Sequence, residues 1–328
     1  MSEFRKDPVL DSWVIIDSSR KINKVLDYGK YPEDISKCPF CHGNEFMTKH
    51  DILTIAKEGD LENWELRVVP NTKPILNIEP VLKREADGIY DKICGVGAHE
   101  IFIETPEHFV KPQDASLHYY ETLYRALIMR IKDLRKDERL EYILFFKNYE
   151  KFANALLEHP HSQLIAMPTI TGMIKAEIDS SKDYFDSKER CVFCDMIAQE
   201  ISSSLRLVYE NDLFISFCPY ASRYPFETWI FPKNHKSDFD FISKDEIENL
   251  SKITKKVLSK INRTLDNCPY NYVLHTSPLK NVNTPFYHWY ISIKPAIIKN
   301  DIGCEWDSGL YVNPVAPEYA AKFLRELY

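Results

Sequence analysis

The stretch "EHPHSQL", residues 158 to 164, decides how this chain is interpreted. It places His159 and His161 two residues apart, on either side of a proline, at the start of an apolar run. Side chains at alternate positions of a strand lean toward the same face. One imidazole could therefore bind a metal while the next reaches a substrate. The interpretation depends on whether the rest of the chain supplies partners for both.

The composition fits a globular protein with a large core and no general affinity for nucleic acid. The chain has 328 residues, of which 44% are hydrophobic, and a formal net charge of −7. It contains 9 glycines and neither a P-loop nor a G-x-G-x-x-G motif, which argues against Gly-rich phosphate loops. Neither a signal-peptide pattern nor a run of about 18 apolar residues occurs. We therefore expect a cytoplasmic protein that binds neither membrane nor nucleic acid.

Four of the eight cysteines form two C-x-x-C pairs, "CPFC" at 38–41 and "CVFC" at 191–194. In an intracellular chain such pairs favour metal or redox chemistry over a disulfide framework. One pair by itself could equally be two buried thiols. Two pairs in one chain suggest a duplicated unit instead. The other cysteines, Cys94, Cys218, Cys268 and Cys304, follow no such pattern.

The two halves repeat the same order of features. Each begins with C-x-x-C, continues with strand-like apolar runs, and reaches a histidine after a proline, His108 in "PEH" and His235 in "PKNH". An amphipathic helix follows, marked by apolar residues at 3–4 spacing over 117–134 and 247–261. Ser243 and Glu246 form a capping box at the start of the second helix.

Two further strands end each repeat, and a histidine marks the second of them. The strands read "YILFFKN" and "EHPHSQLIAMP" in the first half, and "YNYVLH" and "YHWYISIKP" in the second. From His108 to His159 is 51 residues, and from His235 to His288 is 53. The pattern predicts an α+β chain of two equivalent halves, with antiparallel sheets and packed helices.

Each half supplies two cysteines and two histidines, a donor set typical of tetrahedral zinc. Four protein ligands leave no position for water, so both ions are expected to be structural. The first predicted site consists of Cys38, Cys41, His108 and His159, and the second of Cys191, Cys194, His235 and His288.

With His159 assigned to metal, His161 is free for chemistry. A neutral imidazole is a good nucleophile toward phosphorus near pH 7, and covalent attack divides one difficult transfer into two easier steps. Gln163 can donate its amide to a phosphate oxygen. Tyr290 occupies the equivalent position in the second half and is a poor nucleophile at neutral pH. We therefore expect only the first half to be catalytic.

These motifs resemble the galactose-1-phosphate uridylyltransferase family of the histidine triad superfamily, which has ADP-glucose phosphorylase-like relatives. The resemblance rests on "HPHSQ", the paired C-x-x-C motifs, "RVVPN", "PEH", "YPFETWIFPKNH" and "GCEWDSGLYVNPVAPEYAAKFLRE", and covers about residues 4 to 327. It implies tandem histidine-triad-like domains, a catalytic one at residues 1–180 and one with a degenerate site at 181–328. It also implies a homodimer with shared active sites and two zinc ions per chain, with iron as an alternative in the second site.

The resemblance also implies roles for individual residues. His161 matches the nucleophile that becomes nucleotidylated, Gln163 the amide that binds the transferred phosphate, and His159 a metal ligand whose carbonyl orients the nucleophilic ring. The other implied substrate contacts are Arg20, Asn71, Asn148, Ser162, Lys299 and Glu305, of which the last two reach across the dimer interface to the sugar phosphate.

Five histidines lie outside these sets. We interpret His42, His50, His99 and His118 as surface or loop residues. Some relatives bind iron with a histidine near the position of His275, which makes it a candidate for the second metal site.

Several positions depart from the family pattern. In the loop before "HPH", Glu150 and Asn154 stand where glycine is expected, and Leu156 where serine is expected. Asn23 replaces an arginine and Thr72 an acidic residue. An acidic Glu150 near a phosphate would be repulsive unless it points away. These changes bear on substrate and turnover rather than on the fold.

The implied function is that of a nucleotidyltransferase in galactose and carbohydrate metabolism. It would move a nucleoside monophosphate, UMP in the first instance, between a nucleoside diphosphate hexose and a hexose 1-phosphate through a covalent nucleotidyl-histidine. Two alternatives stay open: an adenylyl-transferring sugar-nucleotide phosphorylase that uses inorganic phosphate, and a zinc-stabilised nucleotide-binding protein without turnover. Intact His161 and Gln163 favour an enzyme.

Overall fold

A ten-stranded sheet forms the centre of the structure, which is a computed structural model that describes residues 3–10, 13–16, 35–297 and 309–326. The strand order is β10-β11-β12-β14-β13-β8-β9-β7-β4-β3, and neighbouring strands are antiparallel. Its strands are β3 (Leu53–Ala56), β4 (Trp64–Pro70), β7 (Ala98–Ile103), β8 (Tyr142–Tyr149), β9 (His161–Met167), β10 (Leu207–Glu210), β11 (Phe214–Phe217), β12 (Thr228–Pro232), β13 (Tyr270–His275) and β14 (Tyr290–Pro295).

The strand order shows two equivalent halves joined edge to edge. The series β3-β4-β7-β9-β8 corresponds in order to β10-β11-β12-β14-β13. The halves meet where β8 pairs with β13, with Phe146 opposite Val273. The predicted α+β class, with an antiparallel sheet and packed helices, is confirmed. The boundary expected between residues 180 and 181 falls inside helix α2 (Gly172–Lys188).

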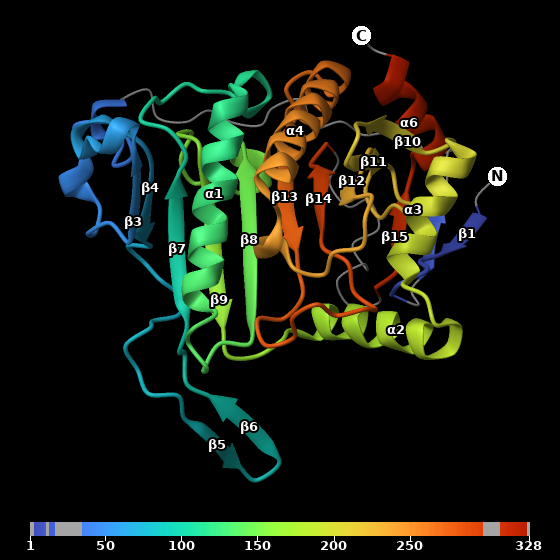
Figure 1. Ribbon diagram of the computed structural model, residues 1–328, viewed down its shortest axis with the longest axis horizontal. Helices are drawn as coiled ribbons and strands as arrows, with labels where there is room; N and C mark the ends of the chain where they lie inside the picture. Colours follow the sequence, from blue (N-terminus) through green and yellow to red (C-terminus); the bar gives the residue numbers. More distant parts are fainter. Residues whose placement is uncertain (1–2, 11–12, 17–34, 298–308, 327–328) are drawn as a thin grey trace.

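Two long helices, one from each half, cover one face of the sheet side by side (Figure 1). They are α1 (Leu117–Leu134) and α4 (Lys244–Leu265), the two amphipathic helices that the spacing predicts. The predicted capping box at the start of α4 is present. The apolar sides of both helices pack with inward side chains such as Leu164 and Ile291 into one continuous core.

The opposite face of the sheet carries the two C-x-x-C segments. Because side chains alternate along a strand, Ile101 and Phe231 point away from α1 and α4 and join two smaller apolar clusters. One cluster includes Cys38. The other includes Cys191 and helix α3 (Val192–Ser203). This face therefore holds the predicted metal ligands of both halves.

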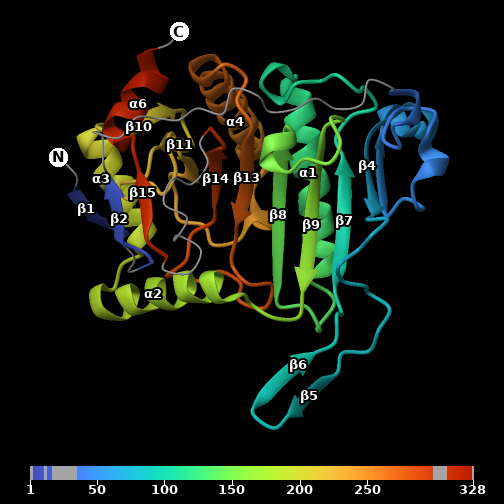
Figure 2. The ribbon, with the colours of Figure 1, turned by 180° about the vertical axis from the view of Figure 1, so that it is seen from behind.

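Smaller elements lie at the edges of the molecule. Strands β1 (Glu3–Lys6), β2 (Trp13–Ile16) and β15 (Tyr311–Asn313) form a three-stranded sheet, and the chain ends in α6 (Pro317–Glu326). Helix α2 runs across one end of the second half (Figure 2). The hairpin of β5 (Arg84–Asp87) and β6 (Tyr90–Ile93) projects away from the body. Within the described ranges, no helix combines the length and apolarity needed to cross a membrane.

Candidate metal centres and active site

The first Cys/His cluster forms as the sequence predicts. Cys38 and Cys41 lie in a tight turn, while His108 and His159 come from the loops after β7 and before β9. One ligand atom from each of the four residues lies within 4.8 Å of the other three. The Sγ atom of Cys41 is 3.2 Å from Nδ1 of His108 and 3.6 Å from Nδ1 of His159. Two sulfurs and two nitrogens thus converge on one point.

A backbone carbonyl orients the imidazole of His159, and a carboxylate lies near the second nitrogen of His108. Nε2 of His159 lies 2.8 Å from the carbonyl oxygen of Thr105, so Nε2 carries the proton and Nδ1 presents its lone pair to the sulfurs. Nε2 of His108 lies 3.7 Å from Glu158. Burial lowers the pKa of His159 to about 4, which keeps the ring in its neutral, metal-binding form. Histidine ligands of metals usually have such a second partner.

The second cluster brings three of its four predicted residues together. Cys191, Cys194 and His235 have ligand atoms within 4.8 Å of one another. Sγ of Cys194 is 3.3 Å from Nδ1 of His235, whose Nε2 lies 3.2 Å from the carbonyl oxygen of Thr284. This arrangement repeats the one in the first cluster.

His288 neighbours the second cluster but is turned differently. Its ring centre is 5.5 Å from that of His235. Its Nδ1 lies 3.0 Å from the carbonyl oxygen of Trp289, and its fully buried Nε2 has no hydrogen-bond partner within the described part of the chain. A buried nitrogen without a partner is costly. A metal ligated by Nε2 would remove that cost, so the donor set fits a metal here as well.

His275 does not belong to the second cluster, contrary to the expectation for that residue. It lies on β13, where its ring stacks on Tyr290 at 4.2 Å between ring centres. Its Nδ1 is 3.8 Å from Glu177. Among the residues that the structure describes, His275 joins no group of three or more potential metal ligands.

His161 is the first residue of β9 and is held as a single tautomer. Its Nδ1 lies 2.8 Å from the carbonyl oxygen of His159, so Nδ1–H donates to that oxygen and Nε2 keeps a free lone pair. The side chain is 8% exposed. Burial lowers the pKa of His161, and the nearby Lys147 adds to this effect. The ring is therefore neutral and nucleophilic at Nε2 near pH 7.

Gln163 lies on the same face of β9, and a histidine fixes its amide. Nδ1 of His99 accepts a hydrogen bond from the backbone N–H of Ile75 at 3.3 Å, so its Nε2 carries the proton. That Nε2–H donates to Oε1 of Gln163 at 2.9 Å. The amide nitrogen of Gln163 is thereby left to donate elsewhere. Asn71 also lies here, with Nδ2 3.1 Å from the same Nε2 of His99.

His99 is a residue that the sequence interpretation missed. The sequence predicts a surface or loop residue here, but His99 is buried on β7, and β9 and β8 separate that strand from the junction of the halves. The signal was present in "HEIFI", where His99, Ile101 and Ile103 occupy alternate positions and share one face.

Asn148 and Ser162 occupy different surroundings. Asn148, on β8, accepts a hydrogen bond from Asn271 at 2.9 Å and donates to the carbonyl oxygen of Asn154. Ser162 points to the opposite face of β9 from His161, and its hydroxyl donates to Glu104. Its side chain is therefore directed toward the core.

A buried charge network lies beneath His161 on that core side. Lys147 forms an ion pair with Glu104 at 2.6 Å and donates to the carbonyl oxygen of His161 at 3.3 Å. Burial raises the pKa of Glu104, but Lys147, Ser162 and Tyr119 outweigh this, and the net pKa lies below the usual value. The carboxylate is thus charged and fixes the backbone that carries His161.

The loop before β9 keeps a glycine-like backbone without glycine. Glu150 has φ 67° and ψ 156°, and Asn154 has φ 69° and ψ 25°. The Glu150 conformation is one that residues other than glycine rarely adopt. Burial and Glu158 raise the pKa of Glu150. Leu156, which stands where serine was expected, is 86% exposed.

Three of the expected substrate contacts, Arg20, Lys299 and Glu305, lie outside the described residues, as do Asn23 and Cys304.

Sequence comparisons relate the chain to sugar-nucleotide enzymes. A family model described as the C-terminal domain of galactose-1-phosphate uridyl transferase matches residues 177–304. An ADP-glucose phosphorylase from Arabidopsis thaliana is 34% identical over 99% of this chain and 93% of that protein. A galactose-1-phosphate uridylyltransferase from Thermotoga maritima is 29% identical over 99% of this chain and 98% of that protein.

Structural comparison gives the same result. A crystal structure of an ADP-glucose phosphorylase from Arabidopsis thaliana with bound ADP-glucose matches with a TM-score of 0.85 and 33% identity over 100% of both chains. Fold and sequence together define a sugar-nucleotide transferase. The chain belongs to the galactose-1-phosphate uridylyltransferase family, as its motifs predict.

Proposed function

We propose that His161 is the nucleophile of a two-step nucleotidyl transfer between a nucleoside diphosphate hexose and a phosphate acceptor. The observation that carries this proposal is the hydrogen bond from Nδ1–H of His161 to the carbonyl oxygen of His159, at 2.8 Å. It fixes the ring so that Nε2 is unprotonated. An imidazole oriented by a second group in this way meets the requirement for an activated nucleophile.

In the first step, Nε2 of His161 attacks the α-phosphorus of the nucleoside diphosphate hexose. A phosphorus–nitrogen bond forms, the bond from phosphorus to the bridging oxygen breaks, and hexose 1-phosphate leaves with the electron pair. The ring becomes positively charged, and the carbonyl oxygen of His159 stabilises that charge through Nδ1–H. In the second step, an acceptor phosphate oxygen attacks the same phosphorus and Nε2 leaves.

Gln163 is proposed to bind the phosphoryl group during both steps. Its Oε1 accepts from His99, which directs its amide N–H groups outward from the same strand face as His161. Donors fixed before the reaction stabilise developing negative charge at little reorganisation cost. Asn71 and Asn148 are proposed to contact the nucleotide, and Ser162 to act through Glu104 on the position of β9.

The relatives support two nucleotides. Transfer of UMP, with a hexose 1-phosphate as acceptor, corresponds to the name of the Thermotoga maritima relative. The higher identity, 34%, is to a protein named ADP-glucose phosphorylase. This favours, as a second candidate, transfer of AMP from ADP-glucose to inorganic phosphate.

Both Cys/His clusters are proposed to hold structural zinc. The first offers four converging donors. The second offers three, and His288, which lies outside that group and whose Nε2 has no hydrogen-bond partner among the described residues, is proposed as the fourth ligand once a metal binds. Zinc would fix the loops that carry these residues, and in the first half the ligand His159 also supplies the carbonyl that orients His161. The same donors admit iron as an alternative in the second cluster.

A homodimer with shared sites is proposed from the family resemblance. Lys299 and Glu305 would contact the sugar phosphate of the partner's site, and Arg20 a phosphate.

Mixed dimers of His161→Ala and Lys299→Ala subunits would contain one site with both substitutions and one with neither. Activity that returns after subunit exchange would support sharing, whereas proven exchange without activity would exclude it.

Intact-mass measurement tests the proposed covalent step. The protein is incubated with UDP-glucose or with ADP-glucose in the absence of acceptor, and the mass increment identifies the nucleotide. His161→Asn should show no increment, and Tyr290→Phe, the matched change in the second half, should show the same increment as the parent. An increment that persists in His161→Asn would exclude this residue as the nucleophile.

A further inference from the structure

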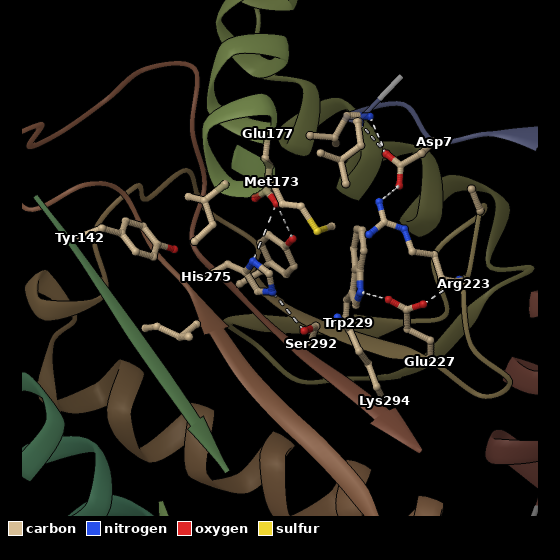
Figure 3. A pocket seen from close by; sticks show the side chains of 16 residues that line it. Asp7, Tyr142, Met173, Glu177, Arg223, Glu227, Trp229, His275, Ser292 and Lys294 are labelled. Carbon is tan, nitrogen blue, oxygen red and sulfur yellow. Dashed lines mark hydrogen bonds and ion pairs between the residues drawn. The ribbon is translucent and has the colours of Figure 1, made fainter. Parts of the chain in front are cut away.

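A cavity lined by residues of both halves lies on the sheet of the second half, at the place that corresponds to the catalytic face of the first half (Figure 3). In the first half, Ile101 on β7 lies opposite Gln163 on β9. In the second half, Trp229 on β12 lies opposite Ser292 on β14. The duplication therefore puts Tyr290 in the place of His161 and Ser292 in the place of Gln163. Both line the cavity, which has a volume of about 200 Å³.

The three carboxylates around the cavity already have donors. Glu227 accepts from the indole N–H of Trp229 at 2.9 Å and from the backbone N–H of Arg223 at 2.8 Å. Glu177 accepts from the hydroxyls of Tyr287 and Tyr290.

The third carboxylate, Asp7, is engaged in the same way. It accepts from the backbone N–H groups of Val9 and Leu10, at 2.8 Å and 2.9 Å. These donors hold the three carboxylates in place, and Asp7 also forms a long ion pair with Arg223 at 4.0 Å.

The two cations of the cavity, in contrast, have unused donors. The ammonium of Lys294 forms no hydrogen bond or ion pair within the described ranges, and its Nζ lies 5.7 Å from the ring centre of Tyr224. The Arg223 guanidinium is 4.0 Å from Asp7, beyond hydrogen-bond distance, and rests over Tyr311. Burial lowers the pKa of Lys294, and Arg223 adds to the effect, while Glu227 and Glu177 only partly oppose it. A partly buried ammonium without an acceptor is costly, so an anion would relieve both groups.

From this geometry we propose that the cavity binds a phosphate-bearing small anion through Lys294 and Arg223, with the hydroxyl of Ser292 as a further contact. A guanidinium and an ammonium supply several donors to the oxygens of one phosphate. The volume exceeds that of the few water molecules needed to solvate one lysine, and Trp229 and Tyr290 provide an aromatic wall for an organic group. The ligand is inorganic phosphate or a hexose phosphate. This site is separate from the one proposed for catalysis.

Calorimetric titration tests the proposal. The His161→Asn protein, saturated with a nucleoside diphosphate hexose so that the catalytic site is filled, is titrated at constant ionic strength with inorganic phosphate and, separately, with glucose 1-phosphate. Lys294→Met should weaken binding at least about tenfold, because a charge-assisted contact is lost. Lys294→Arg should retain it. Lys233→Met is the matched control, since Lys233 pairs with Glu210 on the same half and does not line the cavity.

The outcomes distinguish inorganic phosphate from a hexose phosphate as the ligand, and the cavity proposal from the catalytic proposal. Tighter binding of glucose 1-phosphate indicates that the aromatic wall contacts the hexose, and equal binding indicates a site for the phosphate alone. Circular dichroism and metal content show whether each variant is folded. If Lys294→Met does not fold, Arg223→Gln is the second variant that tests the same site. If the nucleotide sugar does not bind, the titration is done without it and still measures the phosphate affinity that depends on Lys294. A failure of the catalytic proposal is therefore distinguished from a failure of this one. Binding that is absent in the parent, or unchanged in both Lys294→Met and Arg223→Gln, would overturn the proposal.

Discussion

The carbonyl oxygen of His159 accepts a hydrogen bond from Nδ1 of His161 at 2.8 Å, while the imidazole of His159 faces the sulfur of Cys41. One residue thus joins the first Cys/His cluster to the proposed nucleophile. If the ring of His159 shifts, its backbone carbonyl shifts as well. The tautomer and the orientation of the His161 ring, which depend on that carbonyl, would then change.

This link predicts unequal effects for two ligands of the same cluster. His159→Asn should reduce turnover more than His108→Asn, because His108 contacts the cluster but has no contact of this kind with His161. Both variants should lose metal from the first site. Turnover and zinc content, measured on the same preparations, provide the check, and equal loss of turnover at equal zinc content would contradict the link.

The contact between His99 and Gln163 predicts a second effect on rate. His99→Leu removes the donor to Oε1 of Gln163 and leaves the amide free to rotate, so kcat should fall about tenfold. His99→Gln can still donate from its amide and should retain most of the activity. Steady-state kinetics of the two variants decide the matter. A rise in KM with kcat unchanged would show that His99 contributes to substrate binding only.

The sequence predicts those features that depend on short motifs or on the repeat. The C-x-x-C pairs, the "HPH" motif and the two amphipathic helices are local features. The repetition of the C-x-x-C pairs, the helices and the histidines predicts the two equivalent halves of the sheet. The antiparallel sheet and its packed helices follow from the same pattern.

Features that depend on tertiary pairing were not predicted. Glu104 and Lys147 are 43 residues apart and meet only because β7, β9 and β8 are adjacent. His99 meets Gln163 for the same reason. The ring of His288 differs from that of His159 because the carbonyl of Trp289 holds its Nδ1, a local contact that spacing does not reveal.

The two clusters predict two zinc ions per chain and a specific role for His288. Elemental analysis should give about two zinc ions. His288→Ala should lower this to about one and reduce the thermal stability of the second half, with nucleotidylation of His161 retained. His235→Ala is the comparison, because His235 is already in ligand position. If His288→Ala keeps two ions while His235→Ala loses one, the second site has three protein ligands.

The backbone at Glu150 predicts a stabilising substitution. With φ 67° and ψ 156°, a non-glycine residue stores about 1–3 kcal/mol of strain. Glu150→Gly should therefore raise the free energy of unfolding by roughly 1 kcal/mol, after allowance for the greater freedom of glycine in the unfolded chain.

The control for that substitution separates strain from charge. Glu150→Gln removes the charge, which burial and Glu158 disfavour, and keeps the strain. Its gain in stability therefore measures the charge effect alone, and Glu150→Gly should exceed it by the strain that is released. If the carboxylate repels the phosphates of the substrate, both variants should lower KM for the nucleotide sugar by a similar factor. Denaturant unfolding and kinetics on the three proteins test the two effects independently.

Glu177 predicts how stability depends on pH. Burial raises the pKa of its carboxyl to about 7, and the hydroxyls of Tyr287 and Tyr290 only partly oppose this. The folded state therefore holds the proton more tightly than the unfolded state, in which the pKa is about 4.3. The resulting stabilisation is fully present below that value and is lost as the pH rises through about 7, by up to roughly 3 kcal/mol.

Glu177→Gln stays neutral and keeps an acceptor for one tyrosine, so its free energy of unfolding should fall less over the same pH interval. Urea unfolding of the parent and the variant at pH 5, 6, 7 and 8 provides the measurement. Parallel pH profiles for the two proteins would show that Glu177 is ionised in the folded state throughout.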